Sequence, residues 1–156
     1  MKSTALVLVA LSMSATAATA GPTADKKKRD AVDKELAAGA AEVKHCGKTI
    51  KFSFDWAAFD KIDWSKSERE KDHQIGSEIS NVRYVGTGID RLCEDKDYKE
   101  PLQKIDNVVY RTTLGGKDGD PWVTAKIQGS TLTFESRVGG STRGIESFED
   151  AAKKVL

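Results

Sequence analysis

The sequence predicts an α+β domain in which a mainly antiparallel sheet of about four strands is packed on one face by about three helices. Two kinds of hydrophobic periodicity lead to this fold class. Apolar residues recur at helical spacing in some segments and alternate with polar residues in others. Their order along residues 21–156 gives a helix, a strand, a helix, three strands and a final helix.

The first segment, residues 1–20, has the pattern of a cleavable secretory signal peptide. Lys2 precedes an apolar run at 5–11, and the small-x-small sequence at 18–20 suits signal peptidase. A membrane anchor is the alternative, but it would need roughly 20 consecutive apolar residues. We therefore expect one exported domain, residues 21–156, in the periplasm or outside the cell and without membrane insertion.

The charge balance argues against nucleic acid as a partner. The chain has 25 Lys and Arg residues against 24 Asp and Glu, and loss of Lys2 with the signal peptide leaves no net charge. Binding to phosphate backbones needs a surplus of positive charge. The basic run 26–29 is surrounded by acidic residues, so a solvated helix face is the favoured interpretation.

The next segments predict a helix followed by a strand. Within residues 25–43, apolar side chains are spaced for one narrow helical stripe. From residue 48 to residue 56 the period changes to two, with Ile50, Phe52, Phe54 and Trp56 separated by polar residues. Cys46 lies just before this strand. In an oxidising compartment it is expected to form a structural disulfide with Cys93, the other cysteine of the chain.

A second helix is expected to begin at Ser65, where Ser65 and Glu68 have the spacing of a capping box. Apolar residues then step by three or four from Ile75 to Leu92. Glycines at positions 76, 86 and 88 weaken a helix, so residues 66–97 could form one helix or two.

The C-terminal part predicts three strands and a helix. Residues 105–114 are rich in β-formers. Residues 122–128 and 131–137 flank a two-residue Gly-Ser turn, so we expect a hairpin that places Ile127 opposite Leu132 and Ala125 opposite Phe134. Residues 145–156 carry apolar residues on one face, with acids early and lysines late, as the helix dipole favours.

The most distinctive local feature is an aromatic and acidic segment formed by Trp56, Phe59 and Trp64 among aspartates. Packing around the strand end is one interpretation. The other is a ligand-binding surface, because aromatic residues beside polar groups are favoured at binding patches.

Other candidate sites fail on spacing. Ser141, Thr142 and Arg143 precede a predicted helix and offer an anion site at most, since the segment lacks the residues of a P-loop. The two histidines, His45 and His73, form no zinc-binding pattern, so no metal or cofactor is expected. A nucleophilic Cys46 would compete with the disulfide.

These observations favour an exported, non-enzymatic module that binds a partner protein or an envelope component. The Trp56–Trp64 segment is the preferred surface. The alternative is a small secreted hydrolase acting on envelope polymer, with acidic catalytic residues that spacing alone does not identify.

Overall fold

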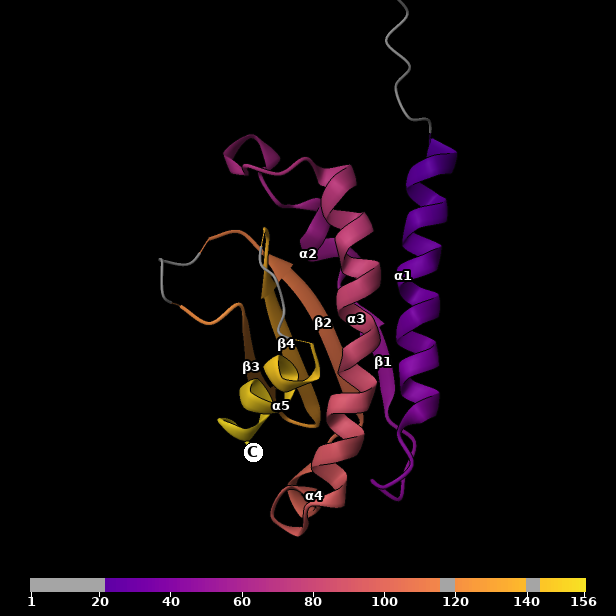
Figure 1. Ribbon diagram of the computed structural model, residues 1–156, viewed down its shortest axis with the longest axis vertical. Helices are drawn as coiled ribbons and strands as arrows, with labels where there is room; N and C mark the ends of the chain where they lie inside the picture. The colour runs from indigo at the N-terminus through magenta and orange to yellow at the C-terminus, as the bar shows by residue number, and fades with distance from the viewer. Residues whose placement is uncertain (1–21, 116–119, 140–143) are drawn as a thin grey trace, which may run out of the picture.

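A computed structural model describes residues 22–115, 120–139 and 144–156 of this chain (Figure 1). The expected signal peptide and the Ser141–Arg143 anion site lie outside the described residues. The elements are, in order, α1 (Pro22–Glu42), β1 (Lys51–Phe54), α2 (Trp56–Asp60), the 3-10 helix η1 (Trp64–Lys66), α3 (Lys71–Glu94), α4 (Lys96–Leu102), β2 (Asn107–Thr113), β3 (Val123–Gln128), β4 (Thr131–Arg137) and α5 (Ile145–Lys153). The predicted α+β class is confirmed.

The sheet has the strand order β1-β2-β4-β3 and is mixed. β1 and β2 are parallel, β2 and β4 are parallel, and only β3 and β4 run antiparallel. The prediction of a mainly antiparallel sheet is therefore wrong. The physical reason lies in the connections: the helical stretch from α2 to α4 is long enough for a crossover between parallel strands.

The predicted hairpin between β3 and β4 is confirmed with its register. Ile127 pairs with Leu132, and Ala125 pairs with Phe134. Gly129 in the turn has φ of 59°, which glycine adopts without steric cost. β4 then pairs with β2 on its other side, so that β4 is an inner strand and β3 is an edge strand.

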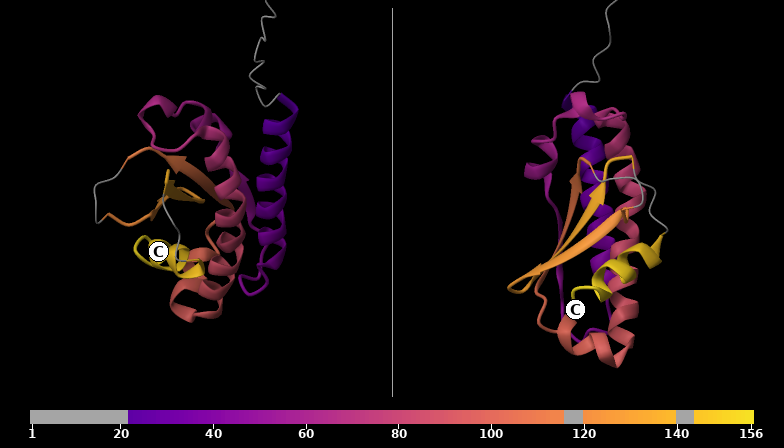
Figure 2. Two further views of the ribbon diagram at one scale, coloured as in Figure 1. Left: turned by 45° about the horizontal axis from the view of Figure 1, so that its top comes forward. Right: turned by 90° about the vertical axis from the view of Figure 1, so that its left-hand side faces the viewer.

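Of the described helices, α1, α3 and α5 lie on one side of the sheet (Figures 1 and 2). The core is buried between this helical layer and the facing side of the strands. It contains Phe54 from β1, Val108 and Tyr110 from β2, and Leu132 and Phe134 from β4. Burial of these large side chains is the main force that holds the helices against the sheet.

Helix α3 is one continuous helix from Lys71 to Glu94, which answers the question of one helix or two. Its glycines allow close packing against α1. Gly86 lies against Gly39, and a Cβ atom at position 86 would collide with the Gly39 backbone. Glycine lowers the helix propensity at these positions, but its lack of a side chain allows the backbones of α1 and α3 to approach closely.

The predicted start of this helix at Ser65 is wrong. Ser65 belongs to η1, where its hydroxyl donates a hydrogen bond to the Asp63 carboxylate at 2.6 Å. The chain leaves η1 at Ser67 in an extended conformation, and α3 begins at Lys71. The capping-box pattern was therefore satisfied by a local turn instead of a helix start.

Besides η1, two short α-helices were not predicted, α2 and α4. α2 begins where the apolar alternation of β1 appeared to continue, and Asp55 caps it by accepting a hydrogen bond from the Ala58 amide at 2.9 Å. The second, α4, contains Pro101 and extends to Leu102. The predicted final helix is confirmed as α5.

The disulfide between Cys46 and Cys93 is present, with a Cα–Cα distance of 4.9 Å. Both cysteines are fully buried. The bond attaches the turn between α1 and β1 to the last turn of α3, as predicted. The two cysteines are 47 positions apart in the sequence. A crosslink between residues so distant along the chain restricts the unfolded state and so stabilises the fold.

Among the helices that the structure describes, none combines the length and the apolar character that crossing a bilayer requires.

Candidate functional site

The sheet has a face opposite the helical layer, which we call the open face. Strand residues alternate between the two sides, so that in β2 Val108, Tyr110 and Thr112 are buried while their neighbours are only half-buried. The pairing register places the following residues on the open face: Ser53, Val109, Arg111, Thr113, Thr124, Lys126, Gln128, Thr131, Thr133, Glu135 and Arg137. This face is rich in hydroxyl groups and charged groups.

A row of four charged side chains crosses the open face from one edge of the sheet to the other. We call Asp55, Arg111, Glu135 and Lys126 the charge row. Arg111 Nη2 lies 2.7 Å from Asp55 Oδ2, and Arg111 Nη1 lies 3.5 Å from Glu135 Oε1. Lys126 Nζ lies 2.5 Å from the same Glu135 oxygen. The charges alternate in sign, so each group stabilises its neighbours.

The register explains why these four side chains meet. Arg111 in β2 is the direct pairing partner of Glu135 in β4, which brings their side chains together on one face. Lys126 is diagonal to Glu135 across the hairpin. Asp55 follows β1 directly, and its amide donates to the Tyr110 carbonyl at 2.8 Å, which places its carboxylate beside Arg111.

The electrostatics of the row keep Asp55 ionised. Partial burial alone would raise the pKa of Asp55, but hydrogen bonds from the Ala58 amide and from Arg111 outweigh it and hold the pKa below its ordinary value. Asp55 is therefore a carboxylate at neutral pH, and it accepts hydrogen bonds without having a proton to give.

On one side of the charge row lies a hollow of about 510 Å³. We call it the lower hollow. It is bounded by residues of all four strands, and hydroxyl and amide groups line much of it. Its lining residues are Ser53, Phe54, Asp55, Val109, Arg111, Gln128, Thr131 and Thr133.

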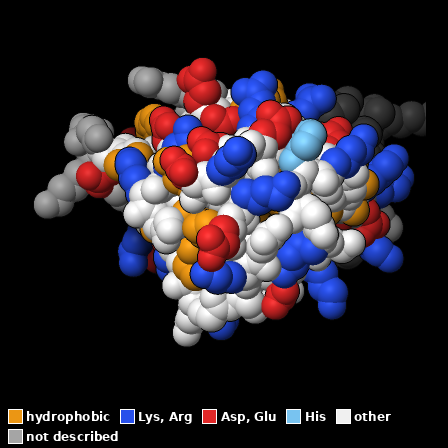
Figure 3. All heavy atoms as spheres, turned by 90° about the horizontal axis from the view of Figure 1, so that it is seen from below, with side chains coloured by type: hydrophobic (Ala, Val, Ile, Leu, Met, Phe, Trp, Pro, Cys, Tyr) orange, Lys and Arg blue, Asp and Glu red, His pale blue; other side chains and the backbone are white. Residues whose placement is uncertain are grey.

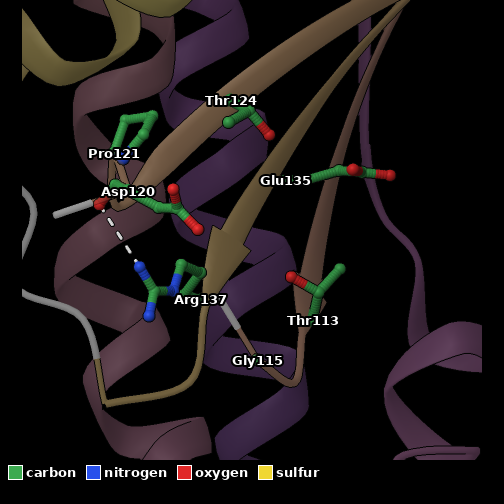
Figure 4. Close-up of a pocket in the computed structure, with 7 residues that line it drawn as sticks. All are labelled: Thr113, Gly115, Asp120, Pro121, Thr124, Glu135 and Arg137. Atoms are coloured by element: carbon green, nitrogen blue, oxygen red, sulfur yellow. Dashed lines mark hydrogen bonds between the residues drawn. The ribbon is translucent and has the colours of Figure 1, made fainter. Parts of the chain in front are cut away.

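On the other side of the row lies a second hollow of about 300 Å³, which we call the upper hollow (Figure 4). Thr113, Thr124 and Glu135 line its floor, and the chain around Asp120 forms one wall. Arg137 Nη1 donates to the Asp120 carbonyl at 3.2 Å. The Arg137 guanidinium also lies 4.7 Å above the centre of the Trp122 ring. Trp122, at 42% exposure, is an aromatic surface at the rim of this face.

The predicted aromatic site lies elsewhere. The structure brings Trp56, Phe59 and Trp64 into one cluster, with Phe59 and Trp64 ring centres 4.9 Å apart. Phe59 is fully buried, and Trp56 stacks on Phe54 at 4.0 Å. The three aromatic residues singled out in the sequence are therefore close together in the structure. Their rings pack around α2.

Sequence reasoning missed a polar cluster in the core. Glu78 in α3 is fully buried, and its carboxylate accepts four hydrogen bonds from neutral donors. The donors are Tyr110 Oη at 2.6 Å, Thr112 Oγ1 at 2.8 Å, Gln74 Nε2 at 2.6 Å and Asn81 Nδ2 at 3.1 Å. Burial and the adjacent negative charge of Glu78 raise the pKa of Tyr110 well above its ordinary value.

A signal for this cluster was present in the sequence. Glu78 lies three residues after Ile75 and four before Val82, which is the spacing of the buried face of α3. An acidic residue at such a position predicts a buried carboxylate with hydrogen-bonding partners. The cluster faces the helical layer, so the body of the sheet separates it from the open face.

The histidines are placed away from both hollows. His73 is exposed on α3, and His45 lies in the turn after α1, beside the C-terminal part of α3. Within the described residues, the open face therefore combines charged groups and hydroxyls without an imidazole.

No protein-family model, curated protein or solved structure matches this chain significantly. An α+β fold class is shared by proteins of many activities, so the fold class by itself does not indicate a function.

Proposed function

We propose that this chain is an exported, non-enzymatic module that binds a partner protein or an envelope component through the open face of its sheet. The observation that carries this proposal is the charge row. Four charged groups of alternating sign span the face between two hollows. A binding surface on a sheet is rigid, so little ordering is needed when a ligand binds.

The chemistry of the face indicates the kind of ligand. The charges of the row cancel, and hydroxyl and amide groups surround them. Such a surface favours a polar, hydrogen-bonding ligand that carries both donors and acceptors. Trp122 at the rim adds an apolar surface of the kind that is enriched at interfaces.

Binding is better supported than hydrolysis. Most hydrolases of glycosidic polymers pair one protonated carboxylic acid with one carboxylate. Asp55 has a lowered pKa, and Glu135 is held by both Arg111 and Lys126. Because its pKa is lowered, Asp55 is a poor proton donor, which weighs against its use as a general acid.

Export is supported by the disulfide, because such bonds persist in oxidising compartments. The signal-peptide pattern of residues 1–20 is a second, independent argument.

The test is co-sedimentation of the chain from Gly21 onward with washed cell-envelope material from its native host. We expect saturable retention. Lys126→Glu should weaken retention about tenfold, since it reverses one charge-assisted contact. Lys34→Glu is the matched control, because Lys34 is an exposed lysine on α1, a helix of the layer that covers the opposite side of the sheet.

The same samples distinguish the alternative function. A hydrolase would release soluble fragments with new reducing ends or new amino termini into the supernatant. Equal retention of Lys126→Glu and Lys34→Glu would show that the open face is not the binding surface.

A further inference from the structure

Three side chains with metal-binding atoms converge where the turn after α1 meets the last two turns of α3. They are His45, Asp90 and Glu94. His45 Nδ1 lies 2.9 Å from Asp90 Oδ2 and 3.3 Å from Glu94 Oε1. All three ligand atoms lie within 4.8 Å of one another. Asp90 and Glu94 are four residues apart, so both carboxylates project from the same face of α3.

The spacing suits a single metal ion. Zn²⁺ binds histidine nitrogens and carboxylate oxygens at about 2.0–2.2 Å, which puts neighbouring ligand atoms of a tetrahedral site about 3.3 Å apart. The two distances from His45 Nδ1, 2.9 Å and 3.3 Å, are close to this value. An ion could therefore be held with small movements of the side chains.

The backbone around the cluster is fixed before any ion binds. Asp90 Oδ1 accepts hydrogen bonds from the Lys44 amide at 2.6 Å and the His45 amide at 2.8 Å, which leaves Oδ2 directed toward the imidazole. The disulfide joins Cys46 to Cys93, the chain neighbours of His45 and Glu94. This covalent link holds the turn against the helix, so little conformational entropy is lost on binding.

The ligand set indicates the class of metal. One imidazole and two carboxylates make a nitrogen and oxygen set, and both cysteines are consumed by the disulfide. Imidazole suits zinc, copper, iron and nickel, whereas calcium and magnesium prefer oxygen ligands alone. His45 is 52% exposed and Glu94 is 57% exposed, so further coordination positions face solvent. Figure 3 views this end of the molecule, where acidic and basic side chains crowd the surface.

We propose that His45, Asp90 and Glu94 form a binding site for a divalent transition-metal ion of the zinc type, held in place by the Cys46–Cys93 disulfide. The site is independent of the proposed function, because it lies at the end of the helical layer and shares no residue with the open face. Sequence patterns could not indicate it, since only the fold brings His45 to the helix.

The experiment is calorimetric titration of Zn²⁺ into the oxidised chain from Gly21 onward. One ion should bind per chain. His45→Asn keeps a side-chain donor for Asp90 but loses the ligand nitrogen, and it should weaken binding about tenfold or more. Glu94→Gln, at an exposed position, should also weaken binding. His73→Asn, which changes the other histidine, should bind as the wild type does.

Thermal unfolding provides a second readout. Zn²⁺ should raise the melting temperature of the wild type and of His73→Asn, because the ion binds the folded state. Without zinc, His45→Asn and Glu94→Gln should melt close to the wild type. The proposal is overturned if the wild type binds no Zn²⁺ at millimolar concentration, or if neither His45→Asn nor Glu94→Gln weakens binding.

Discussion

The two faces of the sheet both carry a polar cluster, but the clusters are built from different groups. On the covered face, the buried carboxylate of Glu78 is surrounded by neutral hydrogen-bond donors such as Tyr110. On the open face, charges of opposite sign pair at the surface, and Lys126 at the end of the row is 53% exposed. One cluster is sealed from water and the other is in contact with it.

This difference separates structure from function. A buried polar group that loses its partner cannot recruit water, so the loss costs its full desolvation free energy. An exposed ion pair exchanges its partner for water at little cost, and such pairs contribute about 0–1 kcal/mol. The Glu78 cluster is therefore expected to specify the fold, while the charge row can exchange its contacts for those of a ligand.

The largest expected effect is that of Glu78→Ala. It leaves four donors without their acceptor and opens space in the core, so the free energy of unfolding should fall by about 3 kcal/mol or more. Urea unfolding at pH 7 measures this. Glu135→Ala, the same change on the open face, should cost less than about 1 kcal/mol. An equal fall in the free energy of unfolding for the two variants would contradict the expected difference between the two faces.

An intermediate effect is expected for Tyr110→Phe, which removes one hydrogen bond to the Glu78 carboxylate and should cost about 2 kcal/mol. Tyr110 has a raised pKa in the folded protein, so it stabilises the fold below its unfolded-state pKa, and this contribution is lost as the pH rises through the folded pKa. Absorbance at alkaline pH should show Tyr110 ionising together with unfolding. Ionisation before unfolding would contradict its burial.

The smallest effect is expected for Asp55→Asn, at about 1 kcal/mol or less at pH 7. Asparagine can still cap α2, but it loses the charge pair with Arg111. Asp55 has a lowered pKa, so its contribution is present above the unfolded-state pKa and disappears as the pH falls through the folded pKa. The variant and the wild type should therefore become equally stable in acid. A difference in stability that persists in acid would mean that the variant had also lost the helix cap of α2.

The local patterns predicted local structure well. The hairpin register followed from alternation around a two-residue turn, and the disulfide followed from an isolated cysteine pair. The parallel pairing of β1 with β2 and of β2 with β4 could not be predicted in the same way, since alternation fixes which side a residue faces but not the strand direction. The helix start predicted at Ser65 was wrong because capping boxes and isolated turns use the same types of residue.

The candidate sites were harder to predict because their members come from distant segments. Asp55 and Arg111 meet only through the pairing of two strands, and His45 reaches Asp90 only through the packing of a turn on a helix. The aromatic residues near Trp56 were identified as a group because they are close in sequence. Closeness in the sequence was therefore enough to identify the aromatic cluster, but it could not identify the charge row.

The inner position of β4 has a consequence for how the chain folds. β4 is the last strand, yet it joins β3 to the rest of the sheet through its pairing with β2. A chain that ends before Thr131 would leave β3 unpaired and one edge of β2 bare. The complete sheet can assemble only after the C-terminal residues are available, and its long-range parallel pairings place it among the slower folding topologies.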